Sequence, residues 1–67
     1  MYYRIKIHTR WGTSFDGPLH PTRDIAADAA QTMLRIHSAP VVVEVHELRN
    51  PHDRNDTRVV ASMEKLE

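Results

Sequence analysis

The chain contains no cysteine, and only two of its 67 residues are glycine. Without cysteine, neither a disulfide nor a Cys-based metal site can stabilise it, which removes the main mark of a small secreted scaffold. Gly12 and Gly17 alone cannot form a phosphate-binding loop or a dinucleotide fingerprint. A Gly-x-Ser-x-Gly elbow is also missing. We therefore expect no enzyme activity and no cofactor.

Net charge and long apolar runs are missing as well. Nine Lys and Arg balance nine Asp and Glu, which argues against a protein devoted to bulk nucleic-acid binding. No apolar run approaches the roughly 20 residues that span a bilayer. Arg4 and Lys6 interrupt the only stretch that could serve as a signal peptide. The expected location is the cytoplasm, without membrane contact.

Polar side chains that could do chemistry are present but poorly spaced. The five histidines lack the close pairs typical of zinc ligands, so we expect no native metal site. Ser14, Asp16 and His20 share one loop, but such a trio without a pocket is rarely a catalytic triad.

Alternation of apolar and polar residues predicts the strands. In residues 2–9, Tyr3, Ile5 and Ile7 point to one side, the pattern of a half-buried strand. Residues 41–48 and 57–66 show the same alternation. A connection over residues 10–21 could hold a further short strand near residues 13–16.

A helix is predicted from Thr22, a good N-cap, to about His37, before Pro40. Helical periodicity gives it an apolar face. That face comprises Ile25, Ala26, Ala29, Met33 and Ile36. Because alanine has a small side chain, we expect the helix to approach the sheet closely at its N-terminal half.

Together these elements predict one α+β domain over residues 1–67. A single helix packs on one face of a small, mainly antiparallel three-stranded sheet in the order β-α-β-β. Placing the last strand between the other two gives a split βαβ arrangement. In the last strand, Val59, Ala61 and Met63 should face inward and Val60 outward. Leu66-Glu67 either belongs to the protein itself or is a remnant of a cloning site before a purification tag.

The sheet face that the helix does not cover should be exposed, and its polar residues allow two interpretations. It is expected to carry Arg4, Lys6, His8, Arg10, Val42, Glu44, His46, Arg58, Val60, Ser62 and Glu64. In the first interpretation, Glu44 and Glu64 pair across strands with the basic residues. In the second, the basic strand recognises an acidic partner or phosphates.

The loops offer similar alternatives. Trp11 and Phe15 lie beside Arg10 and could close one end of the core or form a binding hot spot, where Trp and Arg are favoured. Both can hold if one ring is buried and the other half exposed. The polar segment 49–56 is either a solvated hairpin end or a finger that contacts a partner through Arg49 and Arg54.

In overall pattern, the chain resembles small single-domain proteins of bacteriophages and prophages, including anti-CRISPR and other host-inhibitory proteins. The features that carry this resemblance are the Met-Tyr-Tyr-Arg-Ile-Lys-Ile opening, the Thr22-capped Ala-rich helix and the Val-rich hairpin. It covers the whole chain in shape and includes no diagnostic motif. The chain is similar to a lesser degree to the arm-binding domains of phage integrases, which place their strands before the helix. Neither resemblance assigns a functional residue.

We therefore predict a non-enzymatic, phage-encoded protein that binds and modulates or inhibits a larger host protein. The alternatives are nucleic-acid binding through the basic sheet face and homodimerisation through a strand edge or the open face. The candidate partner-binding residues are Arg4, Lys6, His8, Arg10, Trp11, Phe15, Arg49 and Arg54.

Overall fold

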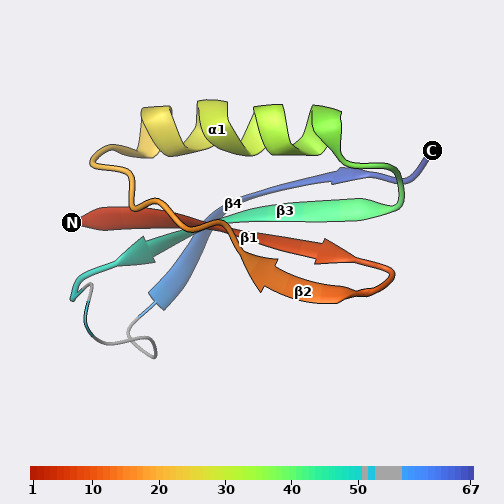
Figure 1. Cartoon of the computed structure of the whole chain (residues 1–67). Coiled ribbons are helices and arrows are strands. Elements are labelled where there is room, and N and C mark those ends of the chain that lie inside the picture. Colours follow the sequence, from red (N-terminus) through yellow and green to blue (C-terminus); the bar gives the residue numbers. More distant parts are fainter. Residues whose placement is uncertain (51, 53–56) are drawn as a thin grey trace.

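A computed structural model describes residues 1–50, 52 and 57–67 of the chain. Its elements are β1 (Tyr2–Thr9), β2 (Gly12–Phe15), α1 (Arg23–Ile36), β3 (Val41–Leu48) and β4 (Thr57–Lys65). The strands form one four-stranded sheet in the order β2-β1-β3-β4, with every neighbouring pair antiparallel. The helix lies across one face of this sheet (Figure 1). The predicted α+β class is confirmed, as are the helix and the short strand near residues 13–16.

The predicted strand order is wrong, because β1 pairs directly with β3 and β4 lies at the edge. The short strand explains the difference. β2 turns the chain back along β1, and His20 then pairs with Tyr3 near the start of β1. The helix therefore begins at that end and runs in the direction of β1, as Figure 1 shows. β3 must return in the opposite direction, which makes it an antiparallel neighbour of β1.

The helix packs through its alanines, as predicted. The Thr22 hydroxyl accepts a hydrogen bond from the Ile25 N–H at 3.2 Å, which satisfies one free donor of the first turn. Ala26 and Ala30 are fully buried against the sheet, and Met33 packs beside them. The predicted face was too wide, since Ile25 and Ile36 are exposed. The buried side of the helix is centred on Ala26 and Ala30 instead.

The core between helix and sheet is built from small and branched side chains. Its fully or nearly fully buried members are Ile5, Ile7, Ala26, Ala30, Val41, Val43 and Val45. Tyr3, Ala61 and Met63 pack against this cluster from the sides. The alternation that predicted the inward faces of residues 2–9 and 41–45 is thus confirmed.

One part of the β4 prediction is wrong. A bulge opposite Val45 and His46 pairs His46 with Val59 and leaves Val60 as the additional residue. Val60 therefore packs against the core, whereas Val59 is exposed. The bulge also shifts Arg58 into register with Glu47, so Arg58 does not join the open face as expected.

The sheet edges are partly blocked. β2 is short, and the His20 bridge occupies the β1 edge beyond it. On the other edge, β4 carries the bulge, and the Arg23 guanidinium donates to the Val60 carbonyl at 2.6 Å. Bulges and short edges discourage pairing with a second chain. Homodimerisation through an edge stays a prediction.

Candidate functional site

The β1–β2 hairpin presents the single tryptophan of the chain to solvent. The Thr9 hydroxyl accepts from the Trp11 N–H at 3.2 Å and donates to the Gly12 carbonyl at 3.3 Å. Gly12 has φ +137°, a backbone conformation that favours glycine. Trp11 is 82% exposed, and the Arg10 guanidinium lies 5.3 Å from its ring centroid. The interpretation that Trp11 closes the core is therefore wrong.

Phe15 lies on the sheet face opposite the helix, which we call the open face. It pairs in register with Lys6. The Lys6 ammonium and the Arg4 guanidinium lie 5.2 Å and 5.4 Å from the ring centroid, both within cation–π range. The ring meets His46 edge to face, with 5.9 Å between centroids. Phe15 thus covers His46 and remains 49% exposed, outside the core.

Two histidines share one carboxylate on this face. His8 Nε2 lies 2.6 Å from Glu44 Oε1, and His46 Nε2 lies 3.2 Å from the same oxygen. A carboxylate only accepts hydrogen bonds, so both Nε2 atoms must carry a proton. His8 Nδ1 is in turn 2.9 Å from the Thr13 hydroxyl. The cluster joins β1, β2 and β3 across the sheet.

The cluster stabilises the charged form of Glu44. The hydrogen bond from His8 is the largest effect that lowers the pKa of Glu44, and the bond from His46 adds to it, while burial opposes both. His46 is buried, and its Nδ1 has no hydrogen-bond partner in the described part of the chain.

Glu44 was expected to pair with the basic residues of β1, and in register it does stand opposite Lys6. Its carboxylate is nevertheless bonded to the two histidines, and the Lys6 ammonium lies over Phe15. Among residues 1–50, 52 and 57–67, no carboxylate lies within salt-bridge distance of Arg4, Lys6 or Arg10. Arg4, Lys6 and Arg10 therefore contact aromatic rings and not carboxylates.

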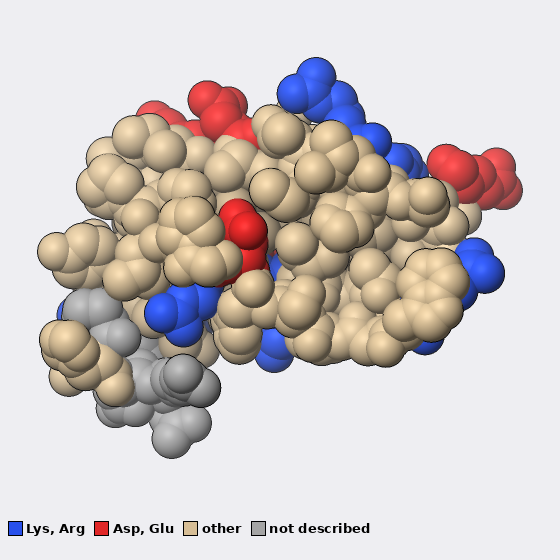
Figure 2. Space-filling view, in the orientation of Figure 1, with Lys and Arg blue, Asp and Glu red and all other residues tan. Residues whose placement is uncertain are grey.

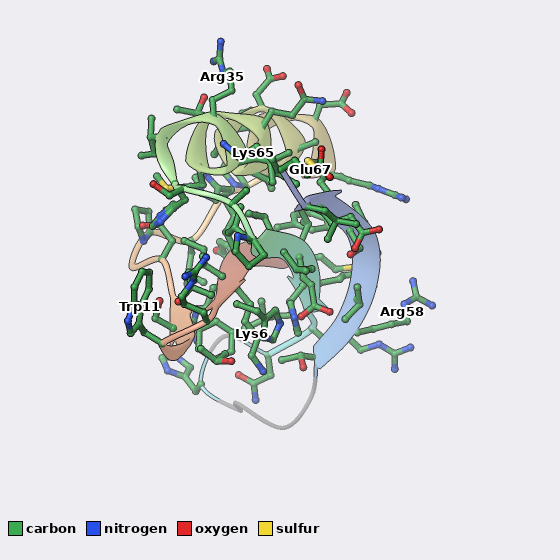
Figure 3. All side chains as sticks on the ribbon, turned by 90° about the vertical axis from the view of Figure 1, so that its right-hand side faces the viewer. Lys6, Trp11, Arg35, Arg58, Lys65 and Glu67 are labelled. Carbon is green, nitrogen blue, oxygen red and sulfur yellow. The ribbon has the colours of Figure 1, made fainter. Side chains whose placement is uncertain are left out.

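The candidate residues divide into two groups. Most of them come together on β1 and its hairpin. Figure 3 shows Lys6 on the side of the sheet away from the helix and Trp11 beside the β2 edge of the sheet. This group comprises Arg4, Lys6, His8, Arg10, Trp11 and Phe15. Arg49 follows β3 at the opposite end of the sheet, where Leu48 pairs with Tyr2. At about 3.4 Å per residue, it is more than 20 Å from the hairpin tip. Arg54 lies outside the described residues.

A hollow of about 270 Å³ lies next to the hairpin, at the end of the sheet. Most of its lining is apolar. The residues around it are His8, Thr9, Arg10, Pro40, Val41, Val42 and Leu66. A second hollow, of about 370 Å³, lies at the opposite end of the sheet and is lined by Glu47, Arg49, Thr57 and Arg58. There the Arg58 guanidinium donates to Glu47 Oε1 at 3.2 Å.

Sequence reasoning placed His8 near His46 but missed the carboxylate that joins them. The signal was available, because Glu44 and His46 are two residues apart on one strand and so share a face. The role of Thr13 could not be read without the β1–β2 register. No hydrogen bond connects the side chains of Ser14, Asp16 and His20, all of which are described.

In the part of the chain that the structure describes, no group of histidine and acidic side chains is arranged to hold a metal ion. The same residues include no helix with the length and apolar character needed to cross a membrane.

Comparison of the chain with known protein families, with curated proteins and with solved structures finds no match.

Proposed function

We propose that this chain is a small non-enzymatic binding protein that captures a larger protein and modulates or inhibits it. The contact is made by the hairpin surface, which consists of Arg4, Lys6, Arg10, Trp11 and Phe15. A phage origin and the cytoplasm of a bacterial host belong to the same proposal, on the resemblance given above.

The observation that carries the proposal is the exposure of Trp11. A domain of this size has a small core and gains most from burying its largest side chains. Here the only tryptophan is 82% exposed at the tip of a hairpin, with Arg10 over its ring. Trp and Arg are the residue types most enriched at binding hot spots. Phe15, Arg4 and Lys6 extend the same surface along β1.

Nucleic-acid binding by the same surface is the second candidate, because exposed aromatic rings beside cations can stack on bases. Two observations favour a protein partner instead. Cations already lie over the rings of Phe15 and Trp11, which occupies part of the ring surface on which a base could stack. On the face of the molecule that Figure 2 shows, Lys and Arg atoms are scattered and form no continuous basic patch.

The test is capture from bacterial lysate with and without nuclease, followed by mass spectrometry. Reversing both charges with Arg4→Glu and Lys6→Glu should abolish capture, and Trp11→Ala should weaken it at least tenfold, the loss typical of a hot-spot side chain. Arg35→Glu is the matched control, since Arg35 is exposed and projects from the outer side of the helix (Figure 3). Capture that survives all of these changes would exclude the hairpin surface, and capture lost with nuclease would indicate nucleic acid.

A further inference from the structure

We infer that the hairpin surface recognises an acidic protein segment, one with carboxylates next to an apolar side chain. This inference rests on the proposed function and specifies the partner. It follows from how the fold places the charges of the open face and from the hollow beside the hairpin.

Glu44 is the acidic residue that stands opposite Lys6 in the β1–β3 register. If Glu44 bonded Lys6, this cation would already have a carboxylate partner within the protein. The two hydrogen bonds from His8 and His46 hold the Glu44 carboxylate at distances of 2.6 Å and 3.2 Å. Because Thr13 also contacts the ring of His8, this arrangement is fixed from three strands. The histidines thus keep the nearest carboxylate of the sheet face away from Lys6.

The cations of the hairpin surface are held over aromatic rings. Arg4 and Lys6 lie within 5.4 Å and 5.2 Å of one ring centroid, that of Phe15. Arg10 lies 5.3 Å from that of Trp11. A cation held over an aromatic ring has already lost part of its side-chain freedom, which lowers the entropic cost of binding a carboxylate. Charge complementarity therefore favours an acidic partner over a basic one.

A hollow of about 270 Å³ lies next to Arg10. Its walls are largely apolar, formed by Pro40, Val41, Val42 and Leu66. An apolar side chain of the partner can enter it while neighbouring carboxylates reach Arg10 and Lys6. A phosphate backbone offers the negative charge without such a side chain, so the combination favours a protein segment.

The experiment is an NMR titration of the full chain with a short peptide of alternating Glu and Leu. The control peptide has Gln at each Glu position. The Glu peptide should shift the amide signals of the hairpin surface, and the Gln peptide should bind at least about threefold more weakly. Replacing Arg4 and Lys6 by Gln should weaken binding of the Glu peptide by about three- to tenfold, the range expected for two exposed ion pairs.

Variants of the cluster give a sharper test. Glu44→Gln removes the competing carboxylate, so the Glu peptide should bind as well as before or more tightly. His8→Val removes the shorter of the two hydrogen bonds that hold Glu44, which leaves its carboxylate freer to approach Lys6. Binding should then weaken by up to the factor expected for loss of one ion pair, roughly two- to fivefold. A dispersed amide spectrum for each variant verifies that it is folded.

Three results would overturn the inference. These are equal binding of the Glu and Gln peptides, no response to loss of Arg4 and Lys6, or tighter binding of a single-stranded oligonucleotide at the same amides. If the Glu peptide does not bind while lysate capture still depends on Trp11, the acidic partner is refuted and the proposed function stands. If lysate capture ignores the hairpin surface, the proposed function fails first.

Discussion

Trp11 and Ile5 provide a direct test of where this fold gets its stability. Truncating the largest side chain of the chain, by Trp11→Ala, should hardly change the free energy of unfolding. Truncating Ile5, a smaller side chain in the middle of β1, should nearly abolish folding. The expected order is the reverse of what side-chain size suggests, because burial decides the cost.

The magnitudes follow from exposure. Trp11 is 82% exposed, so it hides roughly a fifth of a side chain that can bury up to about 250 Å², or about 45 Å². At about 25 cal/mol per Å² this is about 1 kcal/mol, an upper limit because the exposed Arg10 supplies much of the contact. Ile5 is fully buried in the core, and Ile→Ala at such a site costs about 2–5 kcal/mol. A single core of this size supplies only about 3–5 kcal/mol in total.

The assay is urea unfolding followed by far-UV circular dichroism, which does not depend on tryptophan fluorescence. The urea midpoint of Trp11→Ala should differ from that of the unchanged chain by no more than a loss of about 1 kcal/mol would produce. Ile5→Ala should show a transition near zero denaturant, or none. A loss of more than about 2 kcal/mol for Trp11→Ala would mean that the ring stabilises the fold. Its exposure would then no longer indicate a binding role.

Two further predictions concern the helix contact and the histidine cluster. Ala30→Leu should destabilise the chain by about 1–3 kcal/mol, because Ala30 is fully buried between helix and sheet. The control Gln31→Leu, at an exposed position, should change the free energy of unfolding by no more than about 0.5 kcal/mol in the same urea assay. Equal effects of the two substitutions would contradict the close helix contact. The pKa of Glu44 is lowered from its ordinary 4.5, first by the hydrogen bond from His8, so its contribution to stability is present above pH 4.5 and is lost as the pH falls through the lowered pKa. Unfolding measured at neutral pH and well below pH 4.5 should therefore show a smaller acid-induced loss for Glu44→Gln than for the original chain, and parallel losses would contradict a stabilising His8–Glu44 bond.

Much of the candidate surface was predictable because alternation along a strand fixes which side chains share a face. Arg4, Lys6 and His8 follow from the pattern of residues 2–9 alone. Their partners did not follow, since a cross-strand neighbour depends on register and register depends on strand order. The sequence indicated that Glu44 would face a basic strand. Only the β1–β3 register shows that His8 and His46 bind its carboxylate.

The local pattern of the chain determined the α+β class, the helix with its Thr22 cap and the positions of the strands, because these depend on periodicity and capping between near neighbours. Tertiary structure decided the strand order, the bulge that turns Val60 inward, and the exposure of Trp11 and Phe15. For each of these features, the local sequence preferences are compatible with more than one packing, so only long-range contacts decide between them. A short strand of four residues turned the chain back before the helix, and that reversal placed β3 beside β1 and left the Phe15 ring under the Arg4 and Lys6 cations of the open face.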